Sequence, residues 1–256
     1  MASELLKATD VSEVFGGLKA VSDFNVHIDR GELVGLIGPN GAGKTTAFNL
    51  FTGVYQPTTG EIVFDGKSIV GLKPYQITQR GIARTFQNIR LFSELTVLDN
   101  VKIAFHFHVK YGLLEAVCRA GRYFREEEEI EAESMKLLEI FHLEKQAGEL
   151  AKNLPYGAQR RLEIARALAA KPKLLLLDEP AAGMNPQETK ELMEMISWIR
   201  RDFGLTILLI EHDMSLVMGI CERIYVLEYG TIIAQGTPEE IRKDPEVIRA
   251  YLGGEA

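Results

Sequence analysis

The stretch Gly38-Pro39-Asn40-Gly41-Ala42-Gly43-Lys44-Thr45 decides the fold of this chain, because it matches the pattern G-x-x-x-x-G-K-[ST]. The apolar run 33–37 before it predicts a buried strand, and residues 46–51 after it predict a helix. A strand, a glycine loop and a helix N-terminus together form a cradle for phosphate groups. The glycines allow backbone N–H groups to surround a β-phosphate, and Lys44 supplies a charge to the β- and γ-phosphates. The predicted nucleotide-binding residues here are Gly38, Pro39, Asn40, Gly41, Ala42, Gly43, Lys44, Thr45 and Thr46.

Composition narrows the class of protein. The chain has 256 residues, of which 46% are hydrophobic, and this suits one large α/β domain or a domain with a subdomain. The net charge of −7 argues against nucleic acid as the main partner. Cys118 and Cys221 have no metal or redox spacing, so we expect both to be reduced and buried in a cytoplasmic protein. The start at Met1 is no signal peptide, and no apolar run approaches the length of about 20 residues that spans a membrane.

The pattern along the chain predicts an inserted subdomain. Residues 4 to about 86 alternate as strands and form a β-rich layer beside the phosphate loop. Residues 88–170 have helical spacing, and we predict a helical subdomain there, inserted into a core made of residues 1–87 and 171–256. From 171 on, apolar strands alternate with helices, which predicts a parallel sheet covered on both faces.

Three separate segments meet at one edge of this predicted sheet. Ligands of such sheets bind beyond the carboxyl ends of the strands, where the phosphate loop, Asp178-Glu179 and His212 all fall. Asp178 ends an apolar strand and is predicted to hold Mg²⁺ opposite the Thr45 hydroxyl. Glu179 is then placed to act as general base toward the attacking water. His212 is predicted to stabilise the γ-phosphate and to orient that water.

The motifs taken together resemble those of ABC-type ATPases over nearly the whole chain. Residues 154–168 form a loop followed by a strong helix, as in the family's signature, and the order of motifs is the family's own. The resemblance implies a P-loop ATPase core with an N-terminal antiparallel β layer and the inserted helical subdomain. It also implies ATP and Mg²⁺ as cofactors and adenine stacking by Phe15. The implied magnesium ligands are Thr45, Gln87 and Asp178. The implied catalytic residues are Glu179, His212 and Gln87. The implied signature, which would bind the ATP of an opposite subunit, consists of Pro155, Tyr156, Gly157, Ala158 and Gln159.

Two positions depart from the wider family pattern. Pro155 stands where the signature has a serine, so the family's hydroxyl contact to γ-phosphate is missing, and Asn185 stands where an aspartate is usual. Gly157 and the helix N-terminus that follows are kept, so backbone amides still offer an anion site.

A closer resemblance is to the ATPases of branched-chain amino acid importers. It rests on the stretches 84–87, 178–186 and 210–214 and on the ending 250–253. The resemblance implies a second, homologous ATPase subunit, separate permease subunits and, indirectly, a substrate-binding protein. It also implies a peripheral location at the cytoplasmic face of the inner membrane. Two alternatives stay open at this point: the same role in a urea or short-amide importer, and an ABC ATPase acting on DNA or ribosomes.

Overall fold

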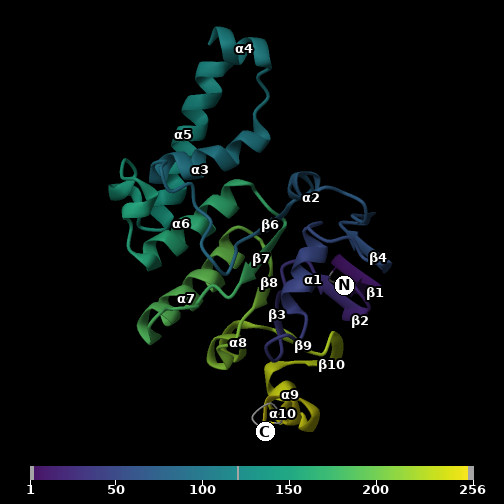
Figure 1. Ribbon diagram of the computed structural model, residues 1–256. Coiled ribbons are helices and arrows are strands. Elements are labelled where there is room, and N and C mark those ends of the chain that lie inside the picture. The colour runs from purple at the N-terminus through teal and green to yellow at the C-terminus, as the bar shows by residue number, and fades with distance from the viewer. Residues whose placement is uncertain (1–2, 120, 253–256) are drawn as a thin grey trace. The chain divides into compact units, whose positions relative to one another are not determined.

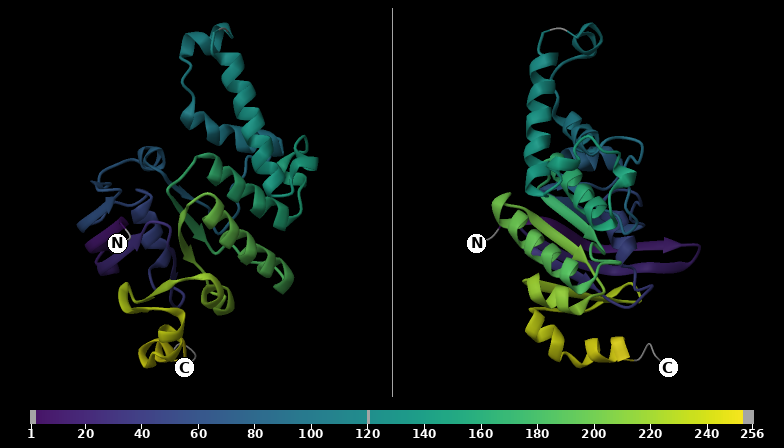
Figure 2. Two further views of the ribbon diagram at one scale, coloured as in Figure 1. Left: turned by 180° about the vertical axis from the view of Figure 1, so that it is seen from behind. Right: turned by 90° about the vertical axis from the view of Figure 1, so that its left-hand side faces the viewer.

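The computed structural model describes residues 3–119 and 121–252, which fall into two compact units. One unit contains Met1–Gln87 and Lys173–Ala256, and the other contains Asn88–Pro172. We call them the core unit and the helical unit. Figures 1 and 2 show the chain as a ribbon, with the helical unit in teal and green. Met1, discussed above as the first residue, and Gly253, the last residue of the stretch 250–253, lie outside the described residues.

The first sheet of the core unit is antiparallel, as predicted. Its strand order is β2-β1-β4-β5. Gly16 and Gly17 both have positive φ and form the two-residue turn between β1 and β2, where sequence analysis placed a break. The strands are β1 (Glu4–Phe15), β2 (Leu18–Asp29), β4 (Thr59–Phe64) and β5 (Lys67–Ser68).

The second sheet is mainly parallel and has the order β10-β9-β3-β8-β7-β6. Only β10 runs antiparallel, against β9. Every residue of β3, β7 and β8 is buried, which explains why these strands are apolar throughout instead of alternating. The strands are β3 (Leu33–Ile37), β6 (Ile82–Arg84), β7 (Leu174–Asp178), β8 (Thr206–Ile210), β9 (Arg223–Glu228) and β10 (Thr231–Gly236).

Helices complete the core unit and close its hydrophobic core. Helix α1 buries Phe48 and Phe51 in one cluster with Phe24 of β2 and Phe64 of β4, so this core joins the helix to the antiparallel sheet. The predicted capping pattern at Thr237 is confirmed, since its hydroxyl accepts from the backbone N–H of Glu240. The helices are α1 (Lys44–Phe51), α2 (Pro74–Arg80), α7 (Pro186–Asp202), α8 (Met214–Ile220), α9 (Pro238–Lys243) and α10 (Pro245–Leu252).

The helical unit is built on α3, α5 and α6, which pack on one another. Buried Asn100 ties the chain before α3 in place: it accepts from the N–H of Phe92 at 2.9 Å and donates to the carbonyls of Phe92 and Thr96. The unit contains α3 (Val97–Phe105), η1 (His106–His108), α4 (Leu113–Cys118), α5 (Tyr123–Ile140), η2 (Glu144–Gln146), η3 (Ala151–Asn153) and α6 (Tyr156–Ala169).

One expectation about the cysteines is wrong. Cys221 is buried as expected, but Cys118 is exposed at the end of α4. Its helix is not packed into the core of the helical unit, which leaves the thiol exposed. Within residues 3–119 and 121–252, no helix combines the length and the apolar character that crossing a membrane requires.

Candidate nucleotide site

The phosphate loop joins β3 to α1 through a backbone that only glycine tolerates. Gly38 has φ +153°, and a Cβ there would lie 2.0 Å from the carbonyl oxygen of Leu227. Gly43 has φ +105°, and a Cβ there would lie 2.5 Å from the carbonyl oxygen of Ala20. The glycines of the motif therefore permit both the conformation and the close approach of neighbouring backbone.

Lys44 lies at the start of α1 with its ammonium group folded back into the loop. Its Nζ donates to the carbonyls of Gly38 at 2.6 Å and Pro39 at 2.9 Å. Burial lowers the pKa of Lys44, while the nearby carboxylates of Glu179 and Asp178 act to raise it. The loop therefore carries a buried cation at the base of the cradle, where an anionic phosphate would be attracted.

Asp178 forms an ion pair that sequence analysis did not anticipate. It lies at the carboxyl end of β7, and the Arg84 guanidinium at the end of β6 donates to its Oδ2 at 2.6 Å. Both side chains are 6% exposed. Arg84 also donates to Asn49 Oδ1 at 2.7 Å and lies over the rings of Phe48 and Phe86. In the sequence, the only feature that pointed to a role for Arg84 was its position three residues before Gln87.

Glu179 is held from two sides. Gln87 Nε2 donates to its Oε2 at 2.7 Å, and His212 Nε2 lies 2.6 Å from its Oε1. Glu179 itself has φ +45°, an uncommon backbone conformation for this residue type. The carboxylate is thus oriented by an amide and an imidazole that come from two other segments of the core unit.

A second carboxylate, that of Glu211, holds the backbone next to His212 in place. Glu211 is 4% exposed and accepts from three backbone N–H groups, those of Ala181, His212 and Asp213. Burial raises the pKa of Glu211, although these three N–H groups act against the shift. Glu211 fixes the loop after β7 relative to the end of β8, and sequence analysis gave it no role.

The phosphate loop from Asn40 onward and the three catalytic candidates, Gln87, Glu179 and His212, line one cleft of about 480 Å³. Its size lies within the range of small-molecule sites. The lining residues are Leu18, Lys19, Ala20, Asn40, Gly41, Ala42, Gly43, Lys44, Thr45, Thr46, Gln87, Glu179, His212 and Tyr229.

Sequence analysis missed four of these lining residues: Leu18, Lys19, Ala20 and Tyr229. They come from the start of β2 and from the turn after β9, both distant in sequence from the loop. Phe15 does not line the cleft. Its ring is 41% exposed and lies edge-on to Tyr55, with 5.0 Å between ring centroids.

The predicted signature begins α6 in the helical unit. Pro155 is the N-cap of this helix, and Gln159 Nε2 donates back to the carbonyl of Leu154 at 2.8 Å. Behind it, the fully buried Arg160 pairs with Glu163 at 2.9 Å and donates to the Tyr156 hydroxyl. The proline caps the helix without a side-chain hydrogen bond, so its terminal N–H groups depend on other partners.

The arrangement suits a reaction at a phosphate. A buried lysine, a glycine loop and an oriented carboxylate surround one cleft. Among the residues described here, no group of three or more His, Cys, Asp and Glu side chains forms a metal site made of protein ligands alone. His106 and His108 have separate partners, Glu127 and the carbonyl of Ala170.

Comparison with family models gives two matches. Residues 21–182 match the model described as ABC transporter, and residues 231–256 match one described as branched-chain amino acid ATP-binding cassette transporter.

Comparison with curated proteins gives relatives of the same length. The chain is 50% identical over 253 residues to the high-affinity branched-chain amino acid transport ATP-binding protein LivG of Escherichia coli (strain K12), with 99% of each chain covered. It is 46% identical to BraF of Pseudomonas aeruginosa, a protein with the same description, again with 99% of each covered. It is 36% identical to the lipopolysaccharide export ATP-binding protein LptB of E. coli, with 97% of each covered.

Two solved structures resemble the fold. One is the ADP conformation of an ATP-binding cassette of an ABC transporter, with a TM-score of 0.84, 30% identity, and 98% of this chain and 99% of that chain covered. The other is a dimeric, post-hydrolysis ATP-binding cassette bound to ADP and Pi, with a TM-score of 0.77, 26% identity, and 91% of this chain and 99% of that chain covered.

Proposed function

Because the chain belongs to the ABC transporter family of ATP-binding proteins, as an ATPase that couples ATP hydrolysis to transport, we propose that it energises the import of branched-chain amino acids. The main support for this substrate is the 50% identity to LivG over the full length. The match of residues 231–256 to the branched-chain family model supports the same substrate. The lipopolysaccharide exporter ATPase is more distant, at 36%.

The cleft of the core unit supplies the groups for ATP hydrolysis. Backbone N–H groups of the loop and the Lys44 ammonium would hold the phosphates. Glu179 would take a proton from the attacking water, with its carboxylate oriented by Gln87 and His212. Each Glu179 oxygen has one partner and can accept a second hydrogen bond, so the water can bind while Gln87 and His212 keep their contacts.

A magnesium site fits the same edge of the sheet. Mg²⁺ keeps several waters and is commonly held by one or two protein ligands together with substrate phosphates. The Thr45 hydroxyl, the Gln87 amide and Asp178 are the residues that would hold it, directly or through water. When bound with ATP, the ion would neutralise charge that develops on the phosphate oxygens. Asp178 would then have to share its carboxylate between Arg84 and this site.

The partners follow from the transporter family. We propose a second, homologous ATPase subunit, so that the signature residues 155–159 of each subunit face the phosphate loop of the other. Separate permease subunits would receive the closing motion, and a substrate-binding protein would deliver the cargo to them. The chain would work as a peripheral subunit on the cytoplasmic side of the membrane.

Substitution of the proposed base tests the hydrolytic role. Glu179→Gln keeps the shape of the side chain but cannot accept the proton, so ATP turnover should fall on the order of 10²–10⁴-fold while ATP binding is retained. The matched control is Glu61→Gln, an exposed carboxylate on β4 that does not line the cleft. Steady-state phosphate release and nucleotide binding would be measured side by side. Near-normal turnover of Glu179→Gln would remove Glu179 from this role.

Reconstitution tests the cargo. The chain would be co-purified with the permease it binds and placed in proteoliposomes together with the substrate-binding protein. Radiolabelled leucine, isoleucine or valine should enter in an ATP-dependent way. Uptake of urea or a short amide in place of these amino acids would support the alternative cargo and overturn the proposal. Co-purification with ribosomes or DNA would contradict a transport role altogether.

A further inference from the structure

The tip of the helical unit exposes an unusual set of apolar side chains. On α4, Leu113, Leu114 and Val117 are 81%, 80% and 74% exposed. Phe107 and Phe124, from the segments before and after α4, are 45% and 58% exposed. A large exposed apolar patch on a soluble domain marks a site of interaction with another surface. We call these five residues the apolar tip.

Helix α4 does not belong to the packed core of its unit. The elements that pack extensively there are α3, α5 and α6, and α4 shares no comparable contact with any of the described elements. In Figures 1 and 2, α4 lies beyond the N-terminal end of α5, at the end of the helical unit away from α6. The apolar tip is therefore not a core face that other parts of this unit cover.

The segment that carries α4 is basic, whereas the chain as a whole carries a net charge of −7. Residues 105–125 contain four basic residues and one acidic residue, Glu115, and the run Glu126-Glu127-Glu128-Glu129 on α5 follows directly, so the positive charge is confined to the segment around α4. The basic residues are Lys110, Arg119, Arg122 and Arg125.

Two of these cations are available to a partner. Arg122 pairs with Glu115 at 3.3 Å and Arg125 with Glu129 at 3.9 Å. Among the described residues, neither Lys110 nor Arg119 makes an ion pair, and both are exposed.

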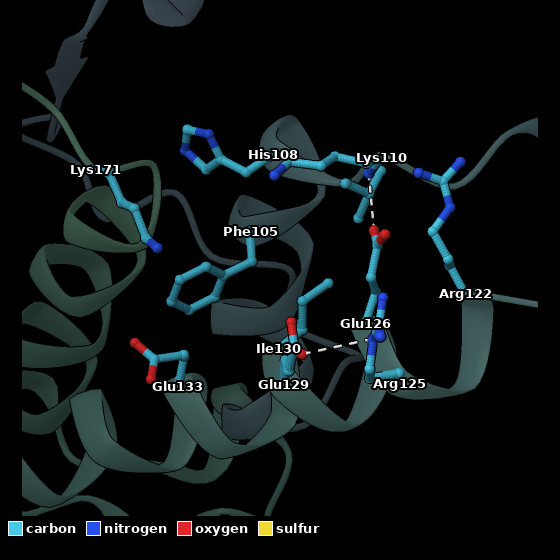
Figure 3. A pocket seen from close by; sticks show the side chains of 11 residues that line it. Phe105, His108, Lys110, Arg122, Arg125, Glu126, Glu129, Ile130, Glu133 and Lys171 are labelled. Atoms are coloured by element: carbon cyan, nitrogen blue, oxygen red, sulfur yellow. Dashed lines mark hydrogen bonds and ion pairs between the residues drawn. The ribbon is translucent and has the colours of Figure 1, made fainter.

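Two acidic side chains near the start of α5, Glu126 and Glu127, hold the base of the tip, whereas Glu128 is exposed. Figure 3 shows the cleft between the segment after α3 and α5, with Lys110 and Arg122 on one side of Phe105, and Lys171 and Glu133 on the other. Here Glu126 accepts from the backbone N–H of Lys110 at 2.8 Å. Glu127 accepts from the Tyr111 hydroxyl at 2.7 Å, and burial together with Glu127 raises the pKa of Tyr111 to about 12. These bonds fix the outgoing chain while leaving the apolar tip free.

We propose that the apolar tip docks on the anionic phospholipid surface of the bilayer. A short amphipathic element with leucine and phenylalanine on one side and lysine or arginine beside them is the composition that inserts at the boundary of headgroups and acyl chains. Leu113, Leu114 and Val117 enter this boundary, and Lys110 and Arg119 lie against lipid phosphates. The proposal rests on the proposed function only in that a transporter subunit works next to a bilayer.

The chain carries its own reporter for the test. Cys118 is exposed within α4, whereas Cys221 is buried and burial raises the pKa of its thiol, so a thiol-reactive fluorophore should label Cys118 selectively. The labelled full-length protein would be mixed with vesicles of phosphatidylcholine alone or with phosphatidylglycerol. We expect a blue shift and quenching by brominated acyl chains on the anionic vesicles, and a weaker response on neutral ones.

Matched variants separate the two parts of the docking surface. Leu113→Glu with Leu114→Glu should lower the vesicle partition coefficient by at least tenfold. Lys110→Gln with Arg119→Gln should lower it on anionic vesicles only, by about fivefold for each cation removed, which corresponds to about 1 kcal/mol. Tyr75→Glu, at a 53% exposed aromatic residue on α2 of the core unit, is the control and should bind as the parent. Unchanged ATP turnover would show that all variants are folded.

Three outcomes would overturn the proposal. The parent protein would fail to bind anionic vesicles, or the tip variants would bind as well as the control. Alternatively, the fluorophore would respond only when the vesicles contain the permease, which would assign the apolar tip to a protein partner. None of these results depends on which cargo is carried, so a failure here is distinguishable from a failure of the proposed transport function.

Discussion

At the scale of the single residue, the buried ion pair of Arg84 and Asp178 should make a large difference to the free energy of unfolding when one partner is removed. Removing one partner of a buried ion pair leaves an uncompensated charge and is strongly destabilising. Arg84→Met keeps most of the volume but removes the charge, and should lower the free energy of unfolding by about 3–5 kcal/mol. Chemical denaturation with urea measures this. The control is Arg30→Met, which breaks the more exposed pair with Asp65 and should cost about 1 kcal/mol or less. Equal losses for the two variants would contradict the assignment.

Phe15 presents a second question at this scale, because it is predicted to stack on adenine but does not line the cleft. Stacking uses the face of the base, so Phe15→Ala should weaken ATP and GTP binding alike, by about 1–3 kcal/mol. Nucleotide titration would measure both affinities. Leu18→Ala, at a residue that does line the cleft, is the comparison. If only Leu18→Ala weakens binding, the base lies against the start of β2 and Phe15 merely packs on Tyr55.

At the scale of the element, the start of α7 explains how Asn185 serves where the family usually has aspartate. The Asn185 side chain accepts from the N–H groups of Gln187 and Glu188 at 3.0 Å, and Glu188 reaches back to the N–H of Asn185. Pro186 occupies the first helical position, where its missing N–H costs nothing. Either residue type can therefore cap the helix.

This cap gives a measurable expectation. Asn185→Ala should lower the free energy of unfolding by about 1 kcal/mol, because two terminal N–H groups lose their acceptor. Asn185→Asp should keep the stability of the parent, since a carboxylate accepts the same bonds and suits a helix N-terminus. Thermal unfolding of the three proteins would decide. A loss with aspartate as large as with alanine would show that the amide has another role.

At the scale of the whole molecule, Pro155 predicts an asymmetric assembly. Proline has neither a hydroxyl nor an N–H, so it cannot donate the charge-assisted bond that a serine would, worth about 1.5–3 kcal/mol. The isolated chain should then hydrolyse ATP slowly, and a homologous partner with a serine in its signature should accelerate it. Pro155→Ser should raise the activity of the isolated chain. The idea fails if the isolated parent already hydrolyses ATP as fast as the pair and the serine changes nothing.

Much of the candidate site could be predicted from local sequence. The loop 38–45 is recognisable from its glycines, which its backbone geometry requires. The burial of β7 and β8 follows from their uninterrupted apolar residues. The rule that ligands gather at the carboxyl ends of parallel strands then brought Glu179 and His212 together correctly. These are short-range signals, with a period or a spacing that the chain itself carries.

Only the tertiary structure decided which side chains pair with groups that are far apart in the sequence. Arg84 and Asp178 are 94 positions apart, and Glu211 bonds to the N–H of Ala181, 30 positions away. No periodicity encodes such partners, because they depend on which strands become neighbours and in which register. Likewise, we expected Cys118 to be buried because it has no metal or redox spacing, yet its helix remains outside the packed core and the thiol is exposed. Local pattern fixes which face of an element is apolar, whereas the topology decides whether anything in the chain covers it.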